Sequence, residues 1–229
     1  MFDDLSCKIK LGNFKKELKE HGYLIFRQAY SLDYCNSIIQ FIDQYKKTDN
    51  IEINYAGTEL RIWNLQNENQ LLSQFFDDSN KIISSIFGKS ILGEKLLAIR
   101  NKSLSPDDYL SRNRRWHIDS FSTLYKIFLF LTDTTESSGP FEFIPNTHKK
   151  LFKLKMLSQG YYFKFSQLGK SARLYQNLND DVIERIKIKG YHPKSILCNA
   201  GTLLVVNTSS IHRARPCNQH HRYALTTYF

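Results

Sequence analysis

The sequence predicts a mainly β fold with flanking helices, in which short strands build a sandwich or jelly roll. Short apolar runs separated by turn residues fill the chain from about residue 91 onward, which is the texture of such strands. Before that point, apolar residues recur mostly at helical spacing. No repeat, low-complexity linker or Pro/Gly/Ser-rich hinge separates the two parts. We therefore expect a single domain over residues 1–229, with a helix-rich part (about 1–90) packed on one face of a strand-built core (about 91–229).

The first part is expected to form helices with one strand between them. Residues 14–22 read as a helix, and the apolar run at 22–26 reads as the strand. Ser31 is a candidate N-cap for the next helix. The apolar residues of that helix recur at helical spacing: Cys35, Ile38, Ile39, Ile42 and Tyr45. Residues 70–88 repeat the helical pattern.

The second part is expected to form the strands of the core. The apolar runs lie at 91–104, 114–121, 124–133, 140–145, 195–212 and 222–229. Turn residues break them at Ser105-Pro106, Gly139-Pro140 and Gly201. The stretch from Lys150 to Pro193 lies between two strand groups, with a helical piece at 180–187. It reads either as an active-site lid or as an ordinary surface excursion.

The chain is basic, with 32 Lys and Arg against 22 Asp and Glu and a formal net charge of +10. Such a charge suits nucleic acid, an acidic membrane surface or an anionic small molecule. The basic residues are spread along the chain, without a basic block or a recognisable nucleic-acid module, which is typical of a merely basic surface. We therefore expect no nucleic-acid partner, and the sequence leaves the oligomeric state open.

Nothing in the sequence directs the chain out of the cytoplasm, where we expect it to act. The first residues carry acids where a secretory signal has bases followed by an apolar run. No apolar run approaches the ~18 residues of a membrane span. The cysteines show neither C-x-x-C spacing nor the density of a disulfide scaffold, so we expect reduced thiols without a role in metal binding: Cys7, Cys35, Cys198 and Cys217.

The stretch RRWHIDSF at 114–121 contains a histidine and an aspartate two residues apart. On a strand, His117 and Asp119 point to the same face and can reach one metal ion. Such a pair also arises by chance, so alone it is a weak motif. His212 is the natural third ligand, because it ends an apolar run that opens at Gly201 and reads as a buried strand. Two histidines and one carboxylate on one face of an octahedron hold Fe(II) and leave positions open.

The other histidines are weaker ligand candidates. His21 precedes a glycine at a helix end, and the others lie in polar, turn-like runs: His148, His192, His220 and His221. Arg222 opens the last apolar run, and an arginine that enters a buried strand needs an anion. That anion is either a dicarboxylic cosubstrate that chelates the metal with its other end, or the partner in a structural salt bridge.

Four elements stand in one order: WHID, LFLTDTTESSGPFEFIPNTHK, GTLLVVNTSSIHRARPCN and R-x-A-L-T. Together they resemble the phytanoyl-CoA dioxygenase family of Fe(II)- and 2-oxoglutarate-dependent oxygenases. The resemblance covers about residues 91–229, and the helical first part is compatible with it. It implies a double-stranded β-helix (jelly-roll, cupin-like) core that uses Fe(II), 2-oxoglutarate and dioxygen. It also implies that His117, Asp119 and His212 are the iron ligands and catalytic residues, and that Arg222 binds the distal carboxylate of 2-oxoglutarate.

The resemblance places two further residues near the cosubstrate. Lys102 falls where many members have a polar or basic residue, and Phe128 falls where they have a bulky side chain. Their other readings are a solvated strand-end charge and a core aromatic. Ala214 departs from the hydroxyl residue that several members carry, which puts one hydrogen bond to the cosubstrate in doubt. Related halogenating enzymes have a small residue in place of Asp119, so its presence favours hydroxylation.

The expected activity is hydroxylation of a small-molecule metabolite with release of succinate and carbon dioxide, while desaturation and ring closure stay open. Arg61, Trp63, Arg100 and the RNRR stretch (112–115) offer cationic and aromatic groups for the mouth of the site, which suits an anionic or hydrogen-bond-rich substrate. A solvated loop is the other reading of RNRR. Two alternatives stay open: a cupin-like metal enzyme that does not use 2-oxoglutarate, in which Arg222 is structural, and a catalytically inactive binding member of the fold.

Overall fold

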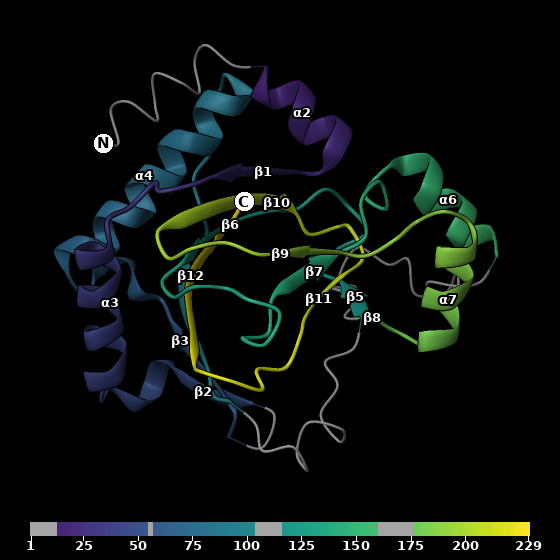
Figure 1. Ribbon diagram of the computed structural model, residues 1–229. Coiled ribbons are helices and arrows are strands. Elements are labelled where there is room, and N and C mark those ends of the chain that lie inside the picture. The colour runs from purple at the N-terminus through teal and green to yellow at the C-terminus, as the bar shows by residue number, and fades with distance from the viewer. Residues whose placement is uncertain (1–12, 55–56, 104–115, 160–175) are drawn as a thin grey trace.

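Two antiparallel sheets face each other in the computed structural model, which describes residues 13–54, 57–103, 116–159 and 176–229 (Figure 1). The larger sheet contains, in spatial order, β1 (Tyr23–Phe26), β10 (Thr202–Asn207), β6 (Tyr125–Phe130), β12 (Arg222–Tyr228), β4 (Leu96–Asn101), β3 (Glu59–Trp63) and β2 (Ile51–Asn54). The smaller sheet contains β8 (Gln176–Leu178), β5 (Trp116–Ile118), β11 (His212–Ala214), β7 (Phe141–Phe143) and β9 (Lys194–Ile196). This arrangement confirms the mainly β, double-stranded β-helix fold.

Three helices cover the outer face of the larger sheet: α2 (Phe14–His21), α3 (Leu32–Gln44) and α4 (Gln70–Phe87) (Figure 1). The sequence predicted all three. Ser31 caps α3 by accepting a hydrogen bond from the backbone of Tyr34 at 3.2 Å. Two short 3-10 turns, η1 (Thr48–Asn50) and η2 (Leu65–Asn67), join these elements. No helix in the described part of the chain has the length and apolar character needed to cross a membrane.

Strand alternation gives the larger sheet two different faces. On β12, Tyr223 and Leu225 point outward into the core shared with the helices. The alternate residues point toward the smaller sheet: Arg222, Ala224, Thr226 and Tyr228. The neighbouring strand β6 follows the same rule, because its residues opposite these are Phe130, Phe128 and Lys126. The inner faces of the two sheets therefore enclose a space, and every second residue of β12 and β6 lines it.

Two further helices, α6 (Lys150–Ser158) and α7 (Asp180–Ile188), pack against the outer face of the smaller sheet. Their buried residues join Trp116, Ile118 and Leu178 in a separate apolar cluster. The sequence predicted α7, whereas α6 was not anticipated because its apolar positions do not form one clean stripe. Residues 160–175, in the middle of the candidate lid, lie outside the described residues.

The expectation of a single strand in the first part of the chain is wrong. β2 and β3 form an antiparallel pair, and β3 also pairs with β4. Their sequences, IEIN and ELRIW, are short and partly polar, so they lack the long apolar run that predicts a buried strand. β2 lies at the edge of the sheet, and its Ile53 is exposed. The larger sheet is thus assembled from both parts of the chain.

Gly201 joins the start of β10 to the segment before α3. Its backbone accepts a hydrogen bond from Tyr30 and donates one to Phe130, and its φ is +80°. A Cβ atom at this position would lie 2.2 Å from the backbone oxygen of Tyr30. The turn therefore requires glycine for both its conformation and its space.

Replacing Gly201 by alanine should lower the free energy of unfolding by about 2–4 kcal/mol, because left-handed strain adds to a backbone clash. Urea denaturation measures this loss. Gly190→Ala is the matched control, since Gly190 has φ of +87° but open space around it. It should cost about 1 kcal/mol. Equal losses for the two variants would show that the close approach of Tyr30 is unimportant.

Candidate metal and cosubstrate site

A His–Asp–His cluster forms where β5 meets β11. His117 on β5 and His212 on β11 are direct register partners, and their ring centroids lie 4.3 Å apart. Asp119 follows β5, and its backbone nitrogen donates to the Thr208 carbonyl at 3.1 Å, which holds the turn in place. One potential ligand atom from each of the three side chains lies within 4.8 Å of the other two. The structure thus brings together the three ligands predicted from the sequence.

His212 presents its Nε2 atom to this cluster. Its Nδ1 lies 2.9 Å from the carbonyl oxygen of Ser210, and a carbonyl can only accept a hydrogen bond. Nδ1 therefore carries the proton, and the lone pair is on Nε2, which lies 3.5 Å from Asp119 Oδ2. Burial, followed by the neighbouring His117, lowers the pKa of His212 to about 3. The imidazole is therefore neutral, as a metal ligand must be.

Asp119 is ionised despite its burial. Burial alone would raise its pKa, but the charges of Lys126, His212 and His117, in that order, bring the pKa well below its usual range. Lys126 Nζ lies 2.7 Å from Asp119 Oδ2. Lys126 is itself buried on β6. The neutral His212 imidazole, the His117 ring and a charged carboxylate therefore converge on one point.

A cavity of about 620 Å³, counting its open mouth, lies between the inner faces of the two sheets next to this cluster. Its lining in the described part of the chain is mainly apolar and aromatic, with a few charged groups: Glu59, Ile99, His117, Lys126, Phe128, Phe130, Phe141, His212, Ala214, Arg222, Ala224, Thr226 and Tyr228. Along β12, Arg222 marks one end and Tyr228, opposite Lys126, marks the other. The cluster and Arg222 therefore border one space.

Arg222 is buried and held by a ladder of polar side chains across three neighbouring strands. Its Nη2 donates to Asn101 Oδ1 at 2.5 Å, and Asn101 Nδ2 donates to Glu59 Oε2 at 2.9 Å. The other oxygen of Glu59 accepts from Arg61 Nε at 2.8 Å. Register explains the ladder, because Arg222 lies opposite Asn101 and Asn101 lies opposite Glu59. The guanidinium is thus oriented before any ligand arrives.

Two of the other sequence-predicted residues lie at or near this cavity. Phe128 lines it, with its ring centroid 5.5 Å from that of Phe141. Arg61 lies on the same face of the sheet, where its Nε binds Glu59, and Glu59 lines the cavity. Glu59 also lines the cavity but was not predicted as a site residue. Its signal in the sequence is a carboxylate at the start of the strand-like stretch ELRIW.

The structure does not bring three other predicted residues to the cavity wall. Lys102 follows β4 with an exposed side chain. Trp63 lies beyond Tyr228, with its ring centroid 6.2 Å from that of the tyrosine. Arg100 points to the opposite face of the sheet, where its Nη1 binds Asp43 of α3 at 2.9 Å. The RNRR stretch at 112–115 lies outside the described residues.

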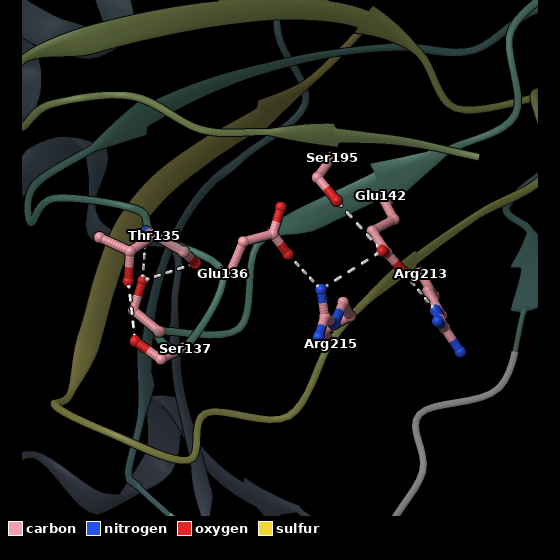
Figure 2. A network of polar contacts seen from close by, with 8 residues as sticks. Thr135, Glu136, Ser137, Glu142, Ser195, Arg213 and Arg215 are labelled. Atoms are coloured by element: carbon pink, nitrogen blue, oxygen red, sulfur yellow. Dashed lines mark hydrogen bonds and ion pairs between the residues drawn. The ribbon is translucent and has the colours of Figure 1, made fainter.

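A polar network on the outer face of the smaller sheet supports the strand that carries His212 (Figure 2). Glu142 on β7 binds Arg213 Nε at 2.6 Å and accepts from Ser195 of β9 at 3.1 Å. The Arg213 guanidinium also lies 4.4 Å from the centroid of the Trp116 ring on β5. Arg215 adds contacts to Glu142 at 3.7 Å and to Glu136 at 2.5 Å. These contacts connect β5, β11, β7 and β9 on the side opposite the histidines.

Lys153 of α6 connects the helix to both ligand-bearing segments. Its buried Nζ donates to the carbonyl of Phe121, two residues after Asp119, at 2.8 Å. It also donates to Ser209 Oγ, three residues before His212, at 2.7 Å. Burial, followed by the charge of Lys150, lowers the pKa of Lys153 to about 8. One ammonium group therefore joins the loop after β5 to the loop before β11.

This lowered pKa predicts a pH-dependent stability. In the unfolded chain Lys153 keeps its ordinary pKa of 10.5, so between pH 8 and 10.5 the unfolded state binds more protons than the folded state. Stability contributed by Lys153 therefore rises with pH in this window. From pH 7.5 to 9.5, the free energy of unfolding of the wild type should gain about 1–2 kcal/mol relative to Lys153→Met. Urea denaturation at both values measures the gain, and the exposed Lys155→Met should show none.

Comparison with known proteins gives one family and one fold. A family model described as phytanoyl-CoA dioxygenase (PhyH) matches residues 18–223. No curated protein matches the sequence at a significant level. Among solved structures, the iron-bound EctD from S. alaskensis is similar over 95% of this chain and 75% of that chain, with a TM-score of 0.69 and 11% identity.

Two further structures show the same likeness. SnoK, a non-haem α-ketoglutarate-dependent carbocyclase from nogalamycin biosynthesis, matches over 93% of this chain and 81% of that chain, with a TM-score of 0.67 and 12% identity. HygX from Streptomyces hygroscopicus, with nickel and 2-oxoglutarate bound, matches over 93% and 84%, with a TM-score of 0.61 and 10% identity. At these identities the likeness shows a shared fold over nearly the whole chain.

Proposed function

Because the chain belongs to the phytanoyl-CoA dioxygenase family of non-haem Fe(II)- and 2-oxoglutarate-dependent oxygenases, we propose that it hydroxylates a small-molecule metabolite and releases succinate and carbon dioxide. The observation that carries this proposal is the shared cavity. A His–Asp–His cluster lies at the end marked by Lys126, and Arg222 marks the other end. A dicarboxylic cosubstrate needs a metal for one end and a cation for the other.

The donor set of the cluster fits Fe(II). Two neutral imidazoles and one carboxylate form the ligand set of non-haem iron oxygenases, and they leave coordination positions for other ligands. His117 and His212 would bind through Nε2, and Asp119 through a carboxylate oxygen. When bound there, Fe(II) supplies the one-electron and dioxygen chemistry that side chains lack. The hydrogen bond from His212 to Ser210 keeps the ring oriented for this role.

Arg222 is the proposed partner of the distal carboxylate of 2-oxoglutarate. A guanidinium binds a carboxylate with two parallel hydrogen bonds, and Asn101 already holds it in one orientation. The guanidinium keeps its positive charge at every physiological pH, so it can form a charge-assisted pair with an incoming carboxylate. Orientation and charge therefore both favour an anion at this end.

The aromatic wall separates these polar ends from water. Phe128, Phe130 and Phe141 line the cavity between the cluster and Arg222, and Phe128 would pack against the carbon chain of the cosubstrate. Excluding water strengthens the charge-assisted contacts and protects a reactive centre from side reactions. The substrate itself enters from the mouth of the same cavity.

Removal of any proposed iron ligand should abolish the chelate. His117→Ala, Asp119→Ala and His212→Ala should each weaken Fe(II) binding by at least about 100-fold, since one of three ligands is lost. Anaerobic titration with Fe(II) and then 2-oxoglutarate follows the weak visible charge-transfer band of the chelate. His148→Ala is the matched control, because that histidine binds the Lys19 carbonyl outside the cavity. A variant that keeps the band would not have lost a ligand.

Loss of Arg222 should weaken 2-oxoglutarate much more than loss of its orienting partner. Arg222→Ala should raise the dissociation constant by about 100-fold or more, because a buried carboxylate loses its charge partner. Asn101→Ala should raise it by about 3–10-fold, which corresponds to one hydrogen bond. The same band, titrated with 2-oxoglutarate, gives both values.

Arg100→Ala is the control for this titration, because Arg100 comes from the neighbouring strand but points to the opposite face. It should bind 2-oxoglutarate as the wild type does. If iron binds to the wild type without producing the band, a metal enzyme that does not use 2-oxoglutarate becomes the better account, with Arg222 as a structural residue.

A further inference from the structure

Helix α6 exposes apolar side chains to solvent. Leu151 is 80% exposed and Leu154 is 58% exposed, and the two lie about one helical turn apart on the same face. The buried residues of the helix lie on its other side: Phe152, Lys153, Met156 and Leu157. In Figure 1, α6 and α7 lie on the side of the molecule opposite α3 and α4. The two exposed leucines therefore contribute to none of the apolar cores.

Lysines flank both leucines on this face. Lys150 is a surface neighbour of Leu154, and Lys155 is a surface neighbour of Leu151, because residues four apart lie one above the other on a helix. Lys149 stands at the N-cap position. All three lysines are exposed, and none of them forms an ion pair within the described part of the chain. The α6 face, which we define by these five residues, is therefore both basic and apolar.

The sequence around α6 lacks acidic residues. No Asp or Glu occurs between Glu142 and Asp180, while the same stretch contains seven Lys and Arg. The formal net charge of the whole chain is +10, so a large part of it comes from this stretch. The missing acids, rather than a block of bases, make the stretch positive. A surface with one sign of charge attracts partners of the opposite sign.

The stability of α6 does not account for these residues. The N-terminus of a helix carries a partial positive charge, which favours acidic side chains and disfavours basic ones. α6 has Lys150 in its first turn, no acidic residue there and no side-chain cap. α7 shows the stabilising arrangement, with Asp180 and Asp181 in its first turn and Arg185 and Lys187 in its last. Residues that work against local stability are expected where a surface serves another purpose.

We propose that the α6 face binds the surface of an anionic lipid bilayer. Its lysines pair with the negative headgroups, and Leu151 and Leu154 enter the boundary between headgroups and acyl chains. The long lysine stems allow the ammonium groups to stay among the headgroups while the leucines are buried. A nucleic acid would engage the lysines, but it offers no apolar layer for two leucines. This inference does not depend on the proposed oxygenase activity, because it concerns where the protein is held.

Co-sedimentation of the whole chain with sucrose-loaded vesicles tests the proposal. Vesicles of phosphatidylcholine with about 30% phosphatidylserine are compared with vesicles of phosphatidylcholine alone. We expect the partition coefficient of the wild type to be about 100-fold higher for the anionic vesicles, since three exposed lysines contribute about fivefold each. Raising NaCl from about 0.1 M to about 0.5 M should weaken this binding, because salt screens the headgroup charges.

Two double substitutions separate the charge of the α6 face from its apolar contact. Lys150→Gln with Lys155→Gln should lower the partition coefficient for anionic vesicles by about 25-fold, which is about fivefold for each lysine. Leu151→Gln with Leu154→Gln keeps every charge and should lower it by at least about tenfold, because two apolar side chains no longer enter the bilayer. Circular dichroism should show an intact fold, since all four side chains are exposed.

Matched substitutions near the ends of α3 and α4 are the controls. Lys46→Gln with Lys89→Gln removes the same amount of charge from exposed positions. Leu92→Gln removes a leucine that is 75% exposed. Both controls should bind the anionic vesicles almost as the wild type does, because neither changes the α6 face.

The proposal fails on any of three results. Equal binding of the wild type to both kinds of vesicle would exclude an anionic bilayer as the partner. An equal loss in the lysine control and in Lys150→Gln with Lys155→Gln would assign binding to the overall charge. Binding to polyglutamate but not to vesicles would assign the α6 face to an acidic protein. These readouts involve neither metal nor turnover, so they are independent of the charge-transfer band that tests the proposed function.

Discussion

The pairing of β5 with β11 is the constraint on which the site depends. His117 and His212 are the residues at which these two short strands meet, so a slip of one residue would turn one histidine to the wrong face. Strands of three residues cannot hold this register through backbone bonds alone. The surrounding contacts supply what is missing: the Arg213 guanidinium on Trp116, the network of Glu142, and the ammonium of Lys153 between the two loops.

These supports act from the side of the smaller sheet that faces away from the cavity. The inner face can therefore consist of ligands and aromatic rings, while the outer face carries ion pairs and the cluster under α6 and α7. The larger sheet is divided in the same way. Its outer face is the apolar core beneath α2, α3 and α4, and its inner face carries Arg222, Lys126 and Glu59. Strand alternation thus separates stability from chemistry within single strands.

The charges in the cavity form two groups that the fold keeps apart. At one end, Glu59, Asn101 and Arg61 hold Arg222 in place, and they come from strands of the first part of the chain and from β4. At the other end, Lys126 forms an ion pair with Asp119, one of the three proposed metal ligands. Apolar and aromatic side chains lie between the two groups. A small dianion suits such a cavity better than a neutral molecule would.

The sequence by itself determined the helices of the first part, the strand-rich second part and the His–Asp–His pattern, because periodicity and ligand spacing are local properties. It also pointed to Arg222, since a cation that opens an apolar strand demands an anion. Only the tertiary structure decided which charged residues share the cavity with these ligands. Arg100 and Asn101 are adjacent in sequence, yet one binds Asp43 on the outer face and the other orients Arg222 on the inner face. That outcome depends on pairing between strands far apart in the chain, which no local pattern records.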